Sequence, residues 1–173
     1  LHYPLRRQRQ MCIRDREGFV TTLANDIQDC CVDTYAHNHP ETPRDHIILG
    51  NIKDVVNELD ELLDGRSADI VIGGPPCQGF SMANRQRLID DPRNHLYKSY
   101  VEAVKKVQPK FFVMENVKGM QSVAEQVKDD FRAIGYSVEC HILNAKNFGV
   151  PQNRERLIYL SLIHISEPTR RSY

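Results

Sequence analysis

A cysteine at position 77 lies in a stiff stretch of chain that could present its thiol for chemistry. It is preceded by Gly-Gly-Pro-Pro and followed by Gln-Gly-Phe-Ser. The prolines lack an N–H and fix φ, so they end the preceding apolar run abruptly. The structural alternative is a small buried hydrophobe, which is the common fate of a free cysteine. Because the flanking residues offer little apolar surface to bury it, we predict that Cys77 is a nucleophile.

A carboxyl group, that of Glu115, follows the apolar run from Lys110 to Met114, in the string Glu-Asn-Val. Burying a carboxyl group is costly unless it is paired or neutral. Glu115 is therefore either a solvated or helix-capping acid, or a functional group. Partial burial favours the protonated form of a carboxyl group, so Glu115 beside the Cys77 loop would suit a general acid.

Two arginines, Arg154 and Arg156, alternate in the string Gln-Asn-Arg-Glu-Arg before the apolar run 157–160. Side chains alternate along an extended segment, so the two guanidinium groups share a face. They repel each other unless they meet an anion or a ligand rich in acceptors. Pairing with internal carboxylates is the structural alternative.

These three strings, in this order, resemble motifs of the DNA (cytosine-5) methyltransferases. Gly-Pro-Pro-Cys-Gln-Gly-Phe-Ser resembles the nucleophile loop, Glu-Asn-Val the catalytic acid motif, and Gln-x-Arg-x-Arg the arginine motif. The resemblance covers about Gly18 to Leu162. It implies an α/β fold, namely an incomplete Rossmann-like methyltransferase core with a mostly parallel sheet flanked by helices. It also implies S-adenosylmethionine as cofactor and double-stranded DNA with a flipped-out cytosine as substrate.

The resemblance implies a role for each of the four catalytic candidates. A thiolate at Cys77 adds to cytosine C6, and Glu115 is the acid near N3. Arg156 is the better candidate for a donor near O2, and Arg154 for a contact with backbone phosphate, although these two roles could be exchanged. After methyl transfer to C5, loss of the C5 proton and expulsion of the thiol release the product.

The cofactor site implied by the resemblance comprises Asp26, Ile27, Asn51, Ile52 and Leu96. Asp26 resembles the acid that binds the ribose hydroxyls, although a helix N-cap is the structural alternative. Ile27 would pack on the adenine ring. Asn51 stands where the family has an aspartate, so its bond from the adenine amino group lacks charge assistance.

Ligands of open α/β sheets bind at the carboxyl ends of the strands, so alternating strands and helices must present these residues at one edge. We predict strands at 19–24, 47–49, 70–72, 110–114, 136–143 and 157–160, with 70–72 buried on both faces. We predict helices from 27 to before Pro40, from 52 with Val55, Leu59 and Leu62 on one side, at 96–107, and at 120–134, ended by Gly135.

Composition indicates one soluble domain of 173 residues without net charge and with a mean hydropathy of −0.50. No apolar run approaches the roughly 20 residues of a membrane span. Five cysteines without framework spacing favour reduced thiols and a cytoplasmic or nucleoid-associated protein. We expect no metal site, because the spacing of the cysteines and histidines between positions 30 and 46 matches no familiar one.

The ends of the chain lack the pattern of its middle. We predict an unpatterned basic tail at 1–16, foreign to the fold, a partial catalytic domain at 17–162 and an unpatterned tail at 163–173. The glycine-rich cofactor loop of the family and its target-recognition domain are not found. We therefore expect a fragment that binds cofactor poorly and methylates little or nothing.

Two other functions remain open. One is a non-catalytic nucleic-acid-binding or regulatory remnant, in which Cys77→Ser would change nothing. The other is a cysteine hydrolase, which would need a histidine within hydrogen-bond reach of Cys77, and only His95 is nearby in sequence.

Overall fold

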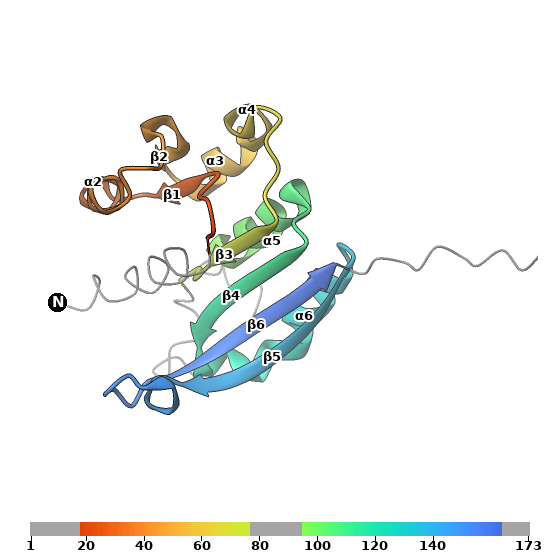
Figure 1. Cartoon of the computed structure of the whole chain (residues 1–173). Coiled ribbons are helices and arrows are strands. Elements are labelled where there is room, and N and C mark those ends of the chain that lie inside the picture. Colours follow the sequence, from red (N-terminus) through yellow and green to blue (C-terminus); the bar gives the residue numbers. More distant parts are fainter. Residues whose placement is uncertain (1–17, 77–94, 164–173) are drawn as a thin grey trace, which may run out of the picture. The chain divides into compact units, whose positions relative to one another are not determined.

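The structure is a computed structural model, which describes residues 18–76 and 95–163. The chain divides into two compact units, Leu1–Arg66 and Ser67–Tyr173. Each unit contains a sheet of its own (Figure 1). No helix among the described residues is long and apolar enough to cross a membrane.

The first unit is built on two short parallel strands. β1 and β2 pair from Ala24↔Ile47 to Asp26↔Leu49. The side-chain amide of Asn25 donates to the carbonyl groups of Ile48 (3.1 Å) and Gly50 (3.0 Å), which holds the end of β2 against β1. The elements are β1 (Ala24–Asp26), α2 (Asp29–Asn38), η1 (Arg44–His46), β2 (Ile47–Leu49), α3 (Ile52–Asn57) and α4 (Leu59–Leu63).

Two expectations for this unit were wrong in their bounds. The strand predicted at 19–24 is observed at 24–26, as β1, because β2 offers only three residues for pairing. Phe19, which the prediction had placed in the strand, is 44% exposed. The single helix predicted after residue 51 is two helices, α3 and α4, that meet at Glu58. The backbone of Glu58 (φ −92°, ψ 8°) departs from helical geometry, so α4 buries Leu63 where the continuous pattern had placed Leu62.

The second unit is a four-stranded sheet in the order β3-β4-β6-β5. β3 pairs parallel with β4, whereas β6 is antiparallel to both of its neighbours. Three of the four strands therefore run the same way, which confirms the mostly parallel sheet. The elements are β3 (Ile70–Gly73), α5 (His95–Val107), β4 (Phe111–Val117), η4 (Lys118–Val123), α6 (Ala124–Arg132), β5 (Tyr136–Asn144), η5 (Ala145–Phe148) and β6 (Glu155–Ile163).

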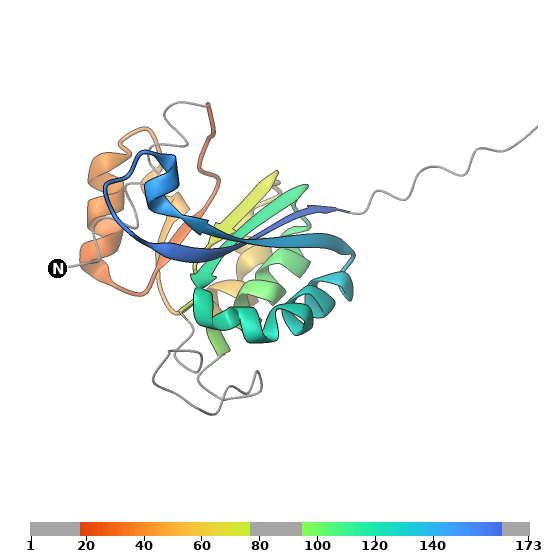
Figure 2. The ribbon, with the colours of Figure 1, turned by 90° about the horizontal axis from the view of Figure 1, so that it is seen from below.

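Helices α5 and α6 cover one face of this sheet and bury the core between them (Figure 2). Phe112 and Phe131 pack with ring centroids 4.1 Å apart, and Tyr136 meets Phe112 edge-on at 5.5 Å. The helical spacing predicted for α5 is confirmed by its fully buried Val104. α6 ends at Arg132, before the predicted residue 134, and Gly135, with φ +93°, lies three residues beyond the end of the helix.

β3 is less buried than predicted. Ile72 is 43% exposed, because β3 pairs only with β4 among the described strands. Its other face is tightly covered, since a Cβ at Gly73 would lie 2.5 Å from the ring of Tyr100. The hydroxyl of Tyr100 shares its one proton between the carbonyls of Val71 (3.2 Å) and Val113 (3.1 Å), and so bridges β3 and β4.

Candidate active site

Glu115 lies within β4. The sequence pattern had instead placed it just beyond the end of this strand. β4 continues to Val117 because β6 pairs with it along its whole length, with Glu115 opposite Ile158. β3 ends its pairing one residue earlier, at Gly73↔Met114. The carboxyl group of Glu115 therefore stands at the point where β3 turns away from the sheet, on the face opposite the helices.

Glu115 forms an ion pair with Arg156. The Nε of Arg156 lies 2.8 Å from Oε1 of Glu115, and the two side chains are 21% and 27% exposed. Arg156 stands opposite Val117 in the ladder, so it is a diagonal neighbour of Glu115 on the same face. Arg156 therefore pairs with an internal carboxylate in this structure, which is the alternative that the sequence had left open. Two of the predicted catalytic side chains are thus in contact.

The backbone of the loop that leads to Cys77 passes directly beside this pair. A Cβ placed on Gly74 would lie 3.1 Å from Oε2 of Glu115. That separation is tighter than most real Cβ contacts, so only glycine lets the loop come this close without displacing the carboxylate. Glycine at position 74 therefore leaves the space that the carboxylate of Glu115 occupies.

Asn116 ties β4 to the same loop, and the sequence analysis had assigned it no role. Its Nδ2 donates to the carbonyl of Pro75 at 3.0 Å, and its Oδ1 accepts from the backbone N–H of Val117 at 2.8 Å. The side chain is 3% exposed, on the helix-facing side of β4. The sequence does carry a signal for this role. Asn116 follows Phe112 and Met114 at a spacing of two residues, so its amide lies on the same buried face of β4.

Cys77 itself lies outside the described residues, as does the side chain of His95. The nucleophile prediction and the competing cysteine–histidine pair both stay predictions. By sequence, Cys77 follows two residues after Pro75, whose carbonyl is fixed by Asn116.

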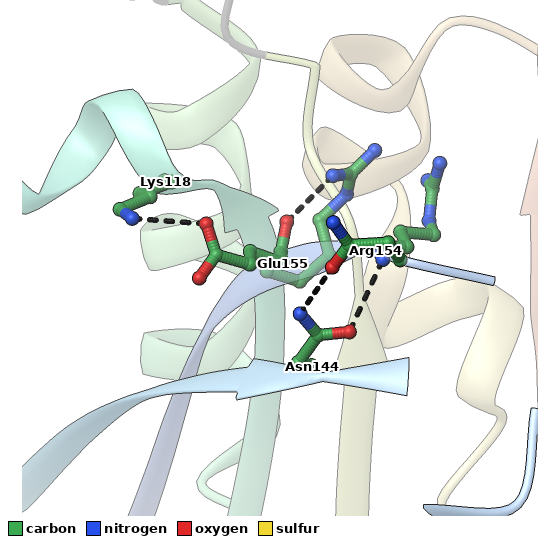
Figure 3. A network of polar contacts seen from close by, with 6 residues as sticks. Lys118, Asn144, Arg154 and Glu155 are labelled. Atoms are coloured by element: carbon green, nitrogen blue, oxygen red, sulfur yellow. Dashed lines mark hydrogen bonds and ion pairs between the residues drawn. The ribbon is translucent and has the colours of Figure 1, made fainter. Parts of the chain in front are cut away.

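Arg154 immediately precedes β6 and is half-buried. Its backbone N–H donates to the side chain of Asn144 (3.2 Å), and its carbonyl accepts from the N–H of Ala145 (3.0 Å). In Figure 3 its guanidinium group extends away from Asn144. The neighbouring Glu155 pairs with Lys118 at 2.9 Å.

Four of the five predicted cofactor residues lie in the first unit, where β1 and β2 end. Asp26 closes β1, and its Oδ1 accepts from the N–H of Gln28 at 2.9 Å, although Gln28 and not Asp26 is the N-cap residue of α2. Ile27 is 66% exposed. The N–H of Gly50, just after β2, donates to the carbonyl of Asp26 at 3.0 Å and so joins the two strand ends.

Asn51 is the N-cap of α3, and its Oδ1 accepts from the N–H of Lys53 at 3.0 Å. Ile52, the first residue of that helix, is half-buried. Leu96, the fifth candidate, is half-buried near the start of α5 in the second unit. No group of three histidine, cysteine or acidic side chains that could hold a metal ion is found within residues 18–76 and 95–163.

The family model for C-5 cytosine-specific DNA methylases matches residues 13–169. This chain belongs to that family. The match contains the Cys77 loop, Glu-Asn-Val and the arginine motif, which confirms the family resemblance drawn from these strings.

Curated methylase relatives agree with this assignment. The chain is 41% identical over 174 residues to the type II methyltransferase M1.HphI of Haemophilus parahaemolyticus, covering 92% of this chain and 45% of the relative. It is also 41% identical over 155 residues to M.BspRI of Lysinibacillus sphaericus, covering 87% of this chain and 34% of the relative. The chain thus spans less than half the length of these methylases.

Solved structures share the fold. A prophage-encoded protein of E. coli, described as a DNA modification methyltransferase, matches 84% of this chain and 41% of its own, with 26% identity and a TM-score of 0.68. The DNMT2 protein of Spodoptera frugiperda matches 94% of this chain and 49% of its own, with 23% identity and a TM-score of 0.68. The methylase fold therefore extends over both units of the chain.

Proposed function

We propose that the protein containing this chain transfers a methyl group from S-adenosylmethionine to C5 of cytosine in double-stranded DNA. The observation that carries the proposal is the Glu115–Arg156 ion pair at 2.8 Å, beside Gly74 in the segment that leads to Cys77. An acid and a guanidinium donor are thus held together where the chain enters the nucleophile loop. This is the set of groups that addition of a thiolate to a pyrimidine requires.

Cytosine C5 is a poor nucleophile until a thiolate has added to C6. We propose that Cys77 forms this C6–S bond and that the carboxylate of Glu115, ion-paired with Arg156, first takes up a proton from solvent and then passes it to N3, so that no charge is left on the ring. Arg156 donates to O2 and, through its ion pair, keeps the carboxyl group of Glu115 oriented. After C5 is methylated, a base removes the C5 proton, the C6–S bond breaks, the thiolate leaves and N3 returns its proton to the carboxylate of Glu115. The target base must leave the duplex to reach these groups.

The ends of β1 and β2 fit the nucleoside half of S-adenosylmethionine, which when bound supplies the methyl group on a positively charged sulfur. Ile27 exposes an apolar side chain for the adenine ring, next to the carboxylate of Asp26 for ribose hydroxyls. The amide oxygen of Asn51 has a second lone pair besides the one that caps α3, and it can accept from the adenine amino group. Ile52, in the first unit, and Leu96, in the second, are the other two proposed cofactor residues.

Arg154 is proposed to contact a DNA phosphate. The net charge of the chain is zero, so phosphate binding must come from local cations of this kind. Because the chain spans 45% and 34% of the two relatives, we expect it to transfer methyl groups slowly or not at all without the rest of the protein.

The test measures transfer of labelled methyl groups to unmethylated duplex DNA by the natural protein that contains this sequence. Cys77→Ser should abolish transfer, whereas Cys30→Ser, a change at an exposed cysteine, should retain it. With 5-fluorocytosine in the DNA, the C5 fluorine cannot leave as a proton does, so a stable protein–DNA adduct should form. Full activity of Cys77→Ser, or no adduct with the unaltered protein, would refute the proposal.

A further inference from the structure

The connection from β5 to β6, residues 145–154, is closed by the side chain of Asn144. Asn144 is the last residue of β5 and stands opposite Glu155, the first residue of β6. Its Oδ1 accepts from two backbone N–H groups, that of Arg154 (3.2 Å) and that of Lys146 (3.2 Å). Its Nδ2 donates to Oδ1 of Asn153 at 2.7 Å. Asn144 thus bonds to both ends of the connection. Figure 3 shows its bond to Arg154.

The backbone extends this closure beyond the side chain. The N–H of Ala145 donates to the carbonyl of Arg154 at 3.0 Å, and the N–H of Val150 donates to the carbonyl of Ala145 at 3.3 Å. Ala145 is 7% exposed, so the connection is anchored in the packed part of the second unit. Both polar groups of the Arg154 backbone are therefore bonded, and the direction in which its side chain leaves the chain is restricted.

The carboxylate of Glu155, the residue between the two arginines in sequence, is paired with Lys118. Glu155 separates Arg154 from Arg156 in sequence, and its Oε2 pairs with Nζ of Lys118 at 2.9 Å. Figure 3 shows this pair on the side of Glu155 away from Arg154. The carboxylate of Glu155 is thus bonded to a lysine and not placed between the arginine side chains, where it would compete with a phosphate.

We propose that Asn144 is a positioning residue for DNA binding: it holds the backbone at Arg154 so that this guanidinium group meets a DNA phosphate. The inference rests on the proposed function, which makes Arg154 the phosphate contact. An amide suits the position because it offers one acceptor to two N–H groups and one donor to Asn153. Alanine would remove all three bonds and loosen the backbone at Arg154, although the bond from the N–H of Ala145 to its carbonyl remains.

The experiment measures the dissociation constant for duplex DNA as a function of salt, using the natural protein. Arg154→Gln should weaken binding on the order of tenfold and make the slope of log K against log salt shallower by about 0.9, the value of one phosphate contact. Asn144→Ala should reproduce most of both effects without removing a charge. Asn147→Ala, at an exposed position of the same connection, is the matched control and should leave affinity within about twofold.

A double variant separates positioning from a general loss of structure. If Asn144 acts through Arg154, adding Arg154→Gln to Asn144→Ala should change affinity and slope little further. Asn144→Ser, which keeps an acceptor at a helix-capping position, should restore part of the slope, and it also serves if the alanine variant fails to fold. Additive effects, or an unchanged slope in Asn144→Ala, would overturn the inference while leaving the proposed function intact. No effect of Arg154→Gln would overturn both the phosphate contact and the role of Asn144.

Discussion

Replacing Asn116 by alanine tests the hydrogen bond that ties β4 to the start of the Cys77 loop. The change leaves the carbonyl of Pro75 and the N–H of Val117 without the partners that now lie at 3.0 and 2.8 Å. Loss of a buried hydrogen-bond partner costs about 1–3 kcal/mol. Pro75 is only half-buried, so water can replace part of its bond. We therefore expect the free energy of unfolding to fall by about 2 kcal/mol.

The assay combines thermal unfolding with the rate at which Cys77 forms an adduct with 5-fluorocytosine DNA. A loss of about 2 kcal/mol should lower the midpoint of unfolding by roughly 10 °C for a unit of this size. Val127→Ala, which truncates a fully buried side chain on α6, is the matched control and should lower the midpoint similarly. Well below either midpoint, Asn116→Ala should slow adduct formation on the order of tenfold, whereas Val127→Ala should not.

Equal rates of adduct formation in the two variants would show that Asn116 contributes only to stability. A change in unfolding free energy below about 0.5 kcal/mol would contradict the buried hydrogen bond itself.

Three further predictions follow from single contacts. Gly74→Ala should reduce methyl transfer on the order of tenfold while changing unfolding little, because its Cβ would lie 3.1 Å from Oε2 of Glu115; full activity would contradict the close approach. Burial raises the pKa of Tyr100 above the ordinary value of 10.0, so the unfolded state loses this proton first and stability should be complete below about pH 10 and fall as pH rises further. Tyr100→Phe should therefore reduce the difference in unfolding free energy between pH 8 and pH 11, measured by urea unfolding at each pH. A difference equal to that of the unaltered protein would contradict this prediction. Asn51→Asp should tighten S-adenosylmethionine binding roughly three- to tenfold in equilibrium dialysis, because a carboxylate adds charge to the adenine contact and still caps α3; equal or weaker binding would exclude this contact.

Much of the secondary structure follows from local pattern. The strand at 47–49 was predicted with its observed bounds, and α5 follows the apolar spacing that ends before Pro109. The positive φ of Gly135, in the turn after α6, also fits the pattern, because glycine tolerates such an angle. These features depend on side-chain periodicity and on residues with restricted or unusual backbone angles, which act over a few positions and are visible in sequence.

The errors in the strands concern pairing partners. β4 was predicted to end before Glu115 because its apolar run ends there, yet β6 pairs with it as far as Val117. β3 was predicted to be buried on both faces because it is apolar throughout, yet Ile72 is 43% exposed. The length and burial of a strand depend on the strands that pair with it, and these come from distant parts of the chain. The apolar run of a strand does not indicate how many strands will pair with it.

For the site, the order of the three motifs was enough to name the family and the candidate residues Cys77, Glu115, Arg154 and Arg156. Which groups touch is a property of the folded chain. The antiparallel ladder between β4 and β6 brings Arg156 to Glu115, and the end of β3 brings Pro75 to Asn116. The roles of Asn116 and Asn144 could not be predicted from the sequence for the same reason: each amide binds a backbone group that folding brings to it, the carbonyl of Pro75 for Asn116 and the N–H of Arg154 for Asn144.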